Sequence, residues 1–150
     1  MEQNKKNLKA MSIVVLVLAG LSLLSILFEL FFGNLNEAFK SASLPEGATD
    51  GVILVAKIVI AAISLLLLLP QIYIGIKGIK VAKNPDNSNG HIVWGIILII
   101  VTAIGVISPI SGIIQGDAIF KNIADLCSII VDIVILYEYV VFAKAVKNGL

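Results

Sequence analysis

The sequence predicts an all-α integral membrane protein, folded as an antiparallel, up-down-up-down bundle of four transmembrane helices. Hydrophobic residues make up 59% of the 150 residues, and charged residues only 14%. Soluble domains carry about 25% charged residues, so this chain holds roughly half the usual share. Four apolar segments are long enough to cross a hydrocarbon layer of about 30 Å, which requires about 20 residues. We therefore expect a single transmembrane domain over residues 1–150.

The predicted helices cover residues 10–32, 52–76, 92–114 and 118–143. The apolar stretch of the first is about 22 residues long, whereas a signal peptide has about 7–15, so we expect it to be retained as an anchor. Short connections after the second and third segments force neighbouring helices to run antiparallel. Pro70 in the second segment and Pro109 in the third predict helix kinks.

The connection between the first two segments has its own pattern. Its apolar residues recur at the spacing of one helix face: Leu35, Ala38, Phe39 and Ala42. This spacing is compatible with a short amphipathic helix on the outer leaflet. An ordinary loop is the equally favoured alternative.

Lysines predict the orientation, because they are enriched in the cytoplasmic loops of membrane proteins. Eight of the eleven lysines fall on one side if the chain crosses four times: Lys5, Lys6, Lys9, Lys77, Lys80, Lys83, Lys144 and Lys147. Both termini are therefore expected in the cytoplasm. All basic residues are lysine and the helices are rich in isoleucine, as is typical of AT-rich bacterial genomes, so we expect a bacterial inner or plasma membrane.

Small and polar residues recur every seven positions in each segment, which keeps one seam of each helix facing its neighbours. At 1.5 Å per residue, the residues of this polar seam sort into layers by depth. The midplane layer is expected to hold Ser22, Ser64, Thr102 and Asp132, with Gln71, Gly95 and Tyr139 nearer the cytoplasm and Glu29, Lys57, Pro109 and Asp125 nearer the outside.

The predicted interior contains three carboxylates, of Glu29, Asp125 and Asp132, but only one cation, Lys57. One carboxylate can pair with Lys57, and the others must be protonated, hydrated or bound to a cation. Asp132 is the deepest, so our hypothesis is that it binds a proton or small cation while Lys57 pairs with Asp125 or Glu29. Alternatively, the seam only holds the helices together, because interhelical polar contacts also stabilise membrane bundles.

Composition argues against several functional classes. A formal net charge of +1 gives no basic surface for nucleic acid, and the single Cys127 excludes an internal disulfide or redox pair. The single His91 excludes a histidine-rich metal site and is expected, like Trp94, to anchor at the cytoplasmic interface. We expect no enzymatic activity, no metal and no cofactor.

Pro70-Gln71, late in a membrane segment and followed by a lysine-bearing turn, resembles the Pro-Gln signature of PQ-loop transporters. That resemblance implies a proline-kinked helix that gates alternating access. Those proteins are built from three-helix repeats, and the four segments here show no such repeat. No family is assigned.

Two functions remain at this stage. The favoured one is a non-catalytic membrane subunit or accessory protein, and the alternative is a small oligomeric transporter or channel that moves a proton-linked solute or a cation past Asp132. The expected partners are the lipid bilayer and either further copies of the chain or another membrane protein.

Overall fold

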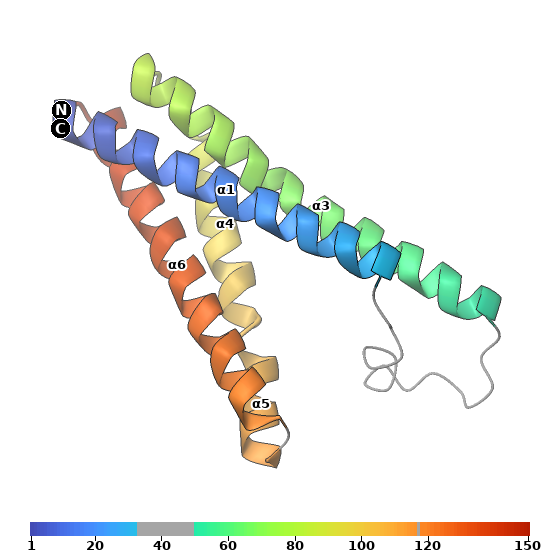
Figure 1. Ribbon diagram of the computed structural model, residues 1–150. Helices are drawn as coiled ribbons and strands as arrows, with labels where there is room; N and C mark the ends of the chain where they lie inside the picture. The colour runs from blue at the N-terminus through green and yellow to red at the C-terminus, as the bar shows by residue number, and fades with distance from the viewer. Residues whose placement is uncertain (33–49, 117) are drawn as a thin grey trace. The chain divides into compact units, whose positions relative to one another are not determined.

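The computed structural model describes residues 1–32, 50–116 and 118–150, and all regular structure within these ranges is helical. Its helices are α1 (Glu2–Phe32), α3 (Asp50–Lys83), α4 (Gly90–Ile104), α5 (Ile107–Gln115) and α6 (Ile119–Lys147) (Figure 1). Four stretches are long and apolar enough to cross a membrane: Glu2–Phe28, Ala61–Lys83, Gly90–Gln115 and Ile119–Lys147. The predicted helical class with four such stretches is confirmed. The pattern noted at residues 34–42 lies outside the described residues.

The helices continue beyond the apolar segments that predict them. Glutamate, glutamine and lysine are good helix formers, so α1 already begins at Glu2, before the apolar run. The helix α3 ends at Lys83 because Asn84 precedes Pro85, and a proline disfavours helical backbone at the residue before it. Hydropathy thus marks where a helix can cross lipid, whereas the ends of the helix depend on local backbone chemistry.

The third apolar stretch is interrupted between α4 and α5. Gly105 donates to the carbonyls of Val101 and Thr102, and Val106 donates to that of Ala103, so the turn tightens at this point. The cause lies at Pro109, because a proline lacks an N–H and its ring clashes with the carbonyl four residues earlier, here that of Gly105. The interruption therefore precedes Pro109, which itself lies buried in α5.

The chain divides into two compact units. Unit 1 comprises Met1–Leu16 and Pro70–Leu150, and unit 2 comprises Val17–Leu69. The main hydrophobic core lies in unit 1 and consists of Leu8, Val15, Ile74, Val81, Ala82, Ile92, Leu98, Leu136, Tyr139, Val140, Ala143 and Val146. In unit 2, most of the described side chains are exposed, and only Ala19 and Leu68 among them are buried.

Within unit 1, α4 and α5 run antiparallel to α6 (Figure 1). A Cβ placed on Gly95 would lie 2.8 Å from Val140, and one on Gly105 would lie 3.9 Å from Ile129. Nearer the other end, Gly112 faces Asn122. These pairs define one register of α4 and α5 against α6, from Asn122 to Val140.

The N-terminal part of α1 and the C-terminal part of α3 also run antiparallel in unit 1. Gly75 contacts Leu16, and Gly78 contacts Ser12, one turn earlier on α1. The two chain ends meet at the same end of this unit, where a Cβ on Gly149 would lie 3.9 Å from the Met1 side chain.

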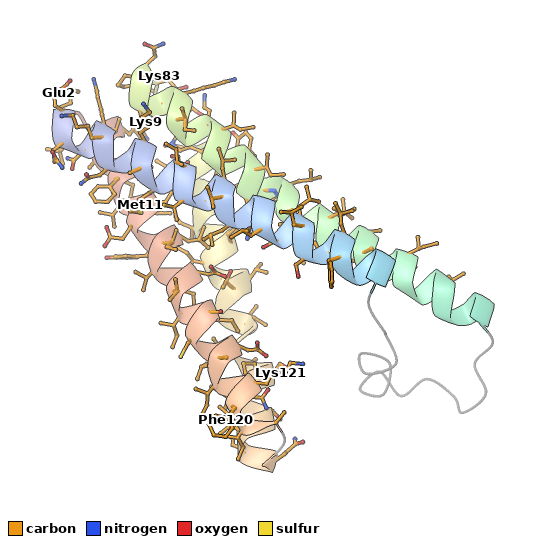
Figure 2. All side chains as sticks on the ribbon, viewed as in Figure 1. Glu2, Lys9, Met11, Lys83, Phe120 and Lys121 are labelled. Atoms are coloured by element: carbon orange, nitrogen blue, oxygen red, sulfur yellow. The ribbon has the colours of Figure 1, made fainter. Side chains whose placement is uncertain are left out.

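Large apolar side chains cover the surface of the described helices. Phe120 is 92% exposed and Ile114 is 79% exposed, and Phe120 projects freely from the start of α6 (Figure 2). Soluble monomers rarely expose continuous apolar surface on this scale. The surface is of the kind that lipid or another apolar partner covers.

Candidate functional site

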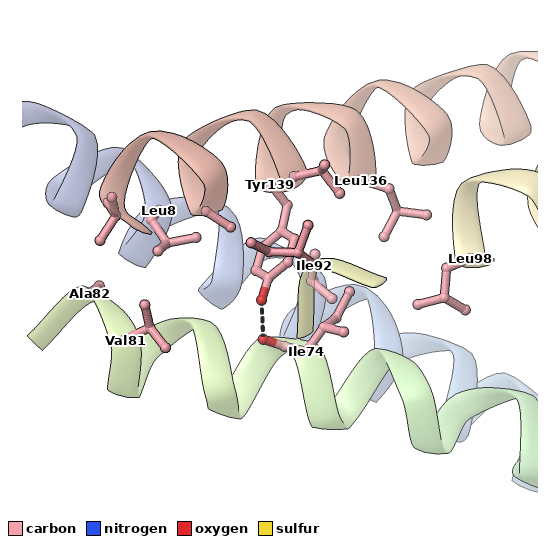
Figure 3. Packing of buried hydrophobic residues seen from close by; sticks show 12 residues of the cluster. Leu8, Ile74, Val81, Ala82, Ile92, Leu98, Leu136 and Tyr139 are labelled. Atoms are coloured by element: carbon pink, nitrogen blue, oxygen red, sulfur yellow. Dashed lines mark hydrogen bonds between the residues drawn. The ribbon is translucent and has the colours of Figure 1, made fainter. Parts of the chain in front are cut away.

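In unit 1, the side chain of Tyr139 packs between the helices of the polar seam. Tyr139 is fully buried, and its hydroxyl donates a hydrogen bond of 2.8 Å to the carbonyl of Ile74 on α3 (Figure 3). Two glycines border the ring: a Cβ on Gly78 would lie 2.7 Å from Tyr139 Cε2, and one on Gly95 would lie 3.5 Å from Cδ1. Because these positions carry no side chain, α3 and α4 can both approach the tyrosine on α6 closely.

Ser12 brings α1 into the same cluster. Its buried hydroxyl donates 2.7 Å to the carbonyl of Leu8, one turn earlier in the same helix, and its Oγ lies against Gly78. This bond satisfies the serine without a partner on another helix. Segments of α1, α3, α4 and α6 therefore meet around Tyr139.

His91 is the group at this site that the sequence placed wrongly. Trp94 is 42% exposed, as an interfacial anchor would be, but His91 is fully buried. Its ring lies edge-on to Tyr139, with centroids 6.3 Å apart, and neither ring nitrogen has a hydrogen-bond partner among the described residues. The available signal was the spacing from His91 to Gly95, which puts both on one face of α4.

A phenylalanine at position 91 is expected to be tolerated. His91→Phe keeps an aromatic ring beside Tyr139 and removes two buried polar atoms whose lack of partners costs about 1–3 kcal/mol. We expect unchanged stability or a gain of about 1 kcal/mol, measured by SDS-induced unfolding in mixed micelles. His91→Asn, which keeps a polar group, is the control. A clear loss of stability in the phenylalanine variant would show that the imidazole has a partner in the membrane.

The connection between α3 and α4 is held by three hydrogen bonds that involve side chains. Lys77 pairs with Asp86 at 2.5 Å, and the other Asp86 oxygen accepts the Ser88 N–H at 3.1 Å. Lys147 on α6 donates to the side-chain oxygen of Asn89, the residue that precedes α4. The hydrogen bond from Lys77 holds the pKa of the Asp86 carboxyl below its usual range.

Acid is expected to release this connection. Because the folded-state pKa of Asp86 lies below its unfolded value of about 3.9, the pair contributes stability above that pH, and the contribution is lost as the pH falls through the folded-state pKa. The protection of the amides of residues 84 and 86–89 against hydrogen exchange, relative to their intrinsic exchange rates, should fall in the wild type below about pH 4. In Asp86→Asn this protection should already be lower at neutral pH, without the loss in acid. Equal exchange in both proteins at neutral pH would contradict the prediction.

Asp132 lies half-buried in the middle of α6. The register set by the pairs Gly95–Val140 and Gly105–Ile129 places it level with Thr102, which is also half-buried. Within the part of the chain that the structure describes, no residue donates a hydrogen bond to Asp132 or pairs with it. Asp125, two turns earlier, is exposed.

The other seam residues are divided between the two units. Unit 1 contains Gln71, half-buried, while unit 2 contains Ser22, exposed, and Ser64, half-buried. Glu29 lies in α1 and Lys57 in α3, but the structure does not describe their side chains. Pro70 lies inside the continuous helix α3, at the boundary between the units. The structure thus brings Asp132 level with Thr102 and leaves the proposed pairing of Lys57 untested.

The described residues contain no group of three or more His, Cys, Asp or Glu side chains that could hold a metal ion. No family model, curated protein sequence or solved structure matches the chain. Its class is therefore defined by the fold, as an all-helical protein with four helices long and apolar enough to cross a membrane.

Proposed function

We propose that the chain is a multi-pass protein of the cell membrane with both termini in the cytoplasm. The two chain ends lie together in unit 1, and Lys147 links the α3–α4 connection to the same end. The eight lysines expected on the cytoplasmic side belong to this end of unit 1, in agreement with the positive-inside rule. Labelling of Asn87→Cys in a Cys127→Ser background, from the cytoplasmic face only, would test the orientation.

Within the membrane, the proposed role is that of a non-catalytic subunit or accessory protein. The observation that carries this proposal is the packing around Tyr139. The tyrosine hydroxyl and the two glycines beside the ring are all used in contacts between helices. Polar and small residues used in this way stabilise a bundle of membrane helices.

A partner is part of this proposal. A carboxylate at the centre of a membrane helix costs about 2.5–3.5 kcal/mol on insertion scales, and Asp132 is only half-buried within the described residues. A second copy of the chain or another membrane protein would shield it from lipid. Native mass spectrometry of the protein released from nanodiscs would separate a homo-oligomer from a monomer that awaits a different partner.

Asp132 also favours the second candidate function, a small transporter or channel for a proton-linked solute or cation. It lies deep in α6, level with the hydroxyl-bearing Thr102, and lacks a cationic partner among the described residues. Intramembrane carboxylates of this kind often mark proton or ion pathways.

Flux measurements in proteoliposomes separate the two functions. Under proton, sodium and potassium gradients, we expect no flux through the wild type. Flux that is present in the wild type, lost in Asp132→Asn and retained in Asp125→Asn would overturn the subunit proposal and identify a transporter. Asp125 is the matched control because it lies on the same helix, two turns away, and is exposed.

A further inference from the structure

Lysines from three helices gather at one end of unit 1. The register of α1 against α3, set by Ser12 beside Gly78, places Lys9 level with Lys80 and Lys83. On α6, the contact between Gly149 and Met1 brings the last turns beside the start of α1. Five lysines at this end are exposed: Lys6, Lys9, Lys80, Lys83 and Lys144.

The positive charge at this end is largely uncompensated. Its eight lysines are accompanied by three side-chain carboxylates, those of Glu2, Asp86 and Glu138, and Asp86 is already paired with Lys77. The exposed lysines therefore repel one another unless an external anion lies among them.

Helix stability accounts for only some of these lysines. Those in the last turns of α3 and α6 interact favourably with the negative ends of the helix dipoles. Lys5, Lys6 and Lys9 lie instead in the first turns of α1, at the positive end of its dipole, where only Glu2 compensates them. Their placement is unfavourable for the helix alone and becomes favourable beside a layer of negative charge.

We propose that this lysine-rich end binds the headgroups of anionic phospholipids in the cytoplasmic leaflet. The inference rests on the membrane insertion proposed above. Two apolar stretches, Ala61–Lys83 and Ile119–Lys147, end among these lysines, so the ammonium groups lie at the depth of the lipid phosphates. The lysines belong to several helix ends, which fits a lipid annulus better than one soluble anion.

Trp94 allows a direct test, because it is the only tryptophan, is exposed and lies one turn inside α4 at this same end. Its fluorescence would be measured in vesicles containing brominated phosphatidylglycerol or brominated phosphatidylcholine, which quench it on contact. We expect phosphatidylglycerol to compete for the annulus several-fold more strongly in the wild type. A single lysine near an anionic surface is worth about fivefold.

Two lysine variants and one control variant test which ammonium groups select the lipid. Lys83→Gln should reduce the selectivity by up to about fivefold, and Lys9→Gln with Lys83→Gln should reduce it further. Lys121→Gln is the control, because Lys121 is exposed on α6 at the opposite end (Figure 2). The selectivity should also fall as ionic strength rises.

The failures can be told apart. If neither brominated lipid quenches Trp94, the chain is not inserted, and both the proposed function and the lipid proposal fail. Equal quenching by the two lipids, or equal effects of Lys83→Gln and Lys121→Gln, would overturn the lipid proposal alone. Loss of the selectivity on adding inorganic phosphate at constant ionic strength would also overturn it, in favour of a soluble anion.

Discussion

Tyr139→Ala is expected to lower the free energy of unfolding by about 3 kcal/mol, the largest effect of any single truncation in unit 1. Tyr139 is fully buried and contacts α3 and α4 at once, so its removal leaves a cavity where these helices meet α6. The hydrogen bond to the Ile74 carbonyl is lost as well.

The cavity dominates this estimate. In a lipid environment the unfolded side chain is already in an apolar medium, so the hydrophobic transfer that governs soluble cores contributes little. The remaining cost is about 24 cal/mol per Å³ of cavity, and the truncation removes on the order of 100 Å³. A hydrogen bond between membrane helices adds about 0.6 kcal/mol on average. Packing therefore accounts for most of the expected loss.

Tyr139→Phe isolates the hydrogen bond, because it keeps the ring and removes only the hydroxyl. We expect a loss of about 0.6 kcal/mol from this variant, compared with the alanine variant by SDS-induced unfolding in mixed micelles, with Trp94 fluorescence as the signal. If the phenylalanine variant lost as much stability as the alanine variant, the hydrogen bond would be the main contribution and the packing argument would be wrong.

Much of the helical architecture could be predicted from the sequence, because the constraints on a membrane helix are local. About 20 apolar residues are needed to cross a bilayer, and this alone identifies the four apolar stretches. Depth along each helix, at 1.5 Å per residue, also grouped Gln71, Gly95 and Tyr139 toward the cytoplasmic side. In the structure Gly95 and Tyr139 are in contact.

The features that the sequence did not predict depend on contacts between helices. His91 is buried and lies edge-on to Tyr139, a residue 48 positions later in the chain. The expected midplane layer joins Ser22 and Ser64, which belong to unit 2, with Thr102 and Asp132, which belong to unit 1, so the layer as a whole stays a prediction. Depth calculated along each helix gives the level of a residue, but not which unit it belongs to.

Gly78→Ala is expected to destabilise the protein by about 1–3 kcal/mol, although alanine is the better helix former. The added Cβ would overlap the Ser12 hydroxyl and would lie 2.7 Å from Tyr139 Cε2. Neither neighbour can yield easily, since Ser12 is hydrogen-bonded to Leu8 and Tyr139 is held by Ile74. The helices must therefore separate, and the close approach that the seam provides is lost.

Gly20→Ala is the matched control for this substitution. Gly20 lies inside α1, and a Cβ there would meet nothing within 4 Å, so alanine should add up to about 1 kcal/mol through helix propensity alone. Both substitutions change propensity in the same way, so the difference between them measures the steric cost at Gly78. We expect that difference to be about 2–4 kcal/mol in SDS-induced unfolding. Equal effects of the two variants would mean that α1, α3 and α6 do not meet at Gly78. The packing around Tyr139 on which the subunit proposal rests would then be contradicted.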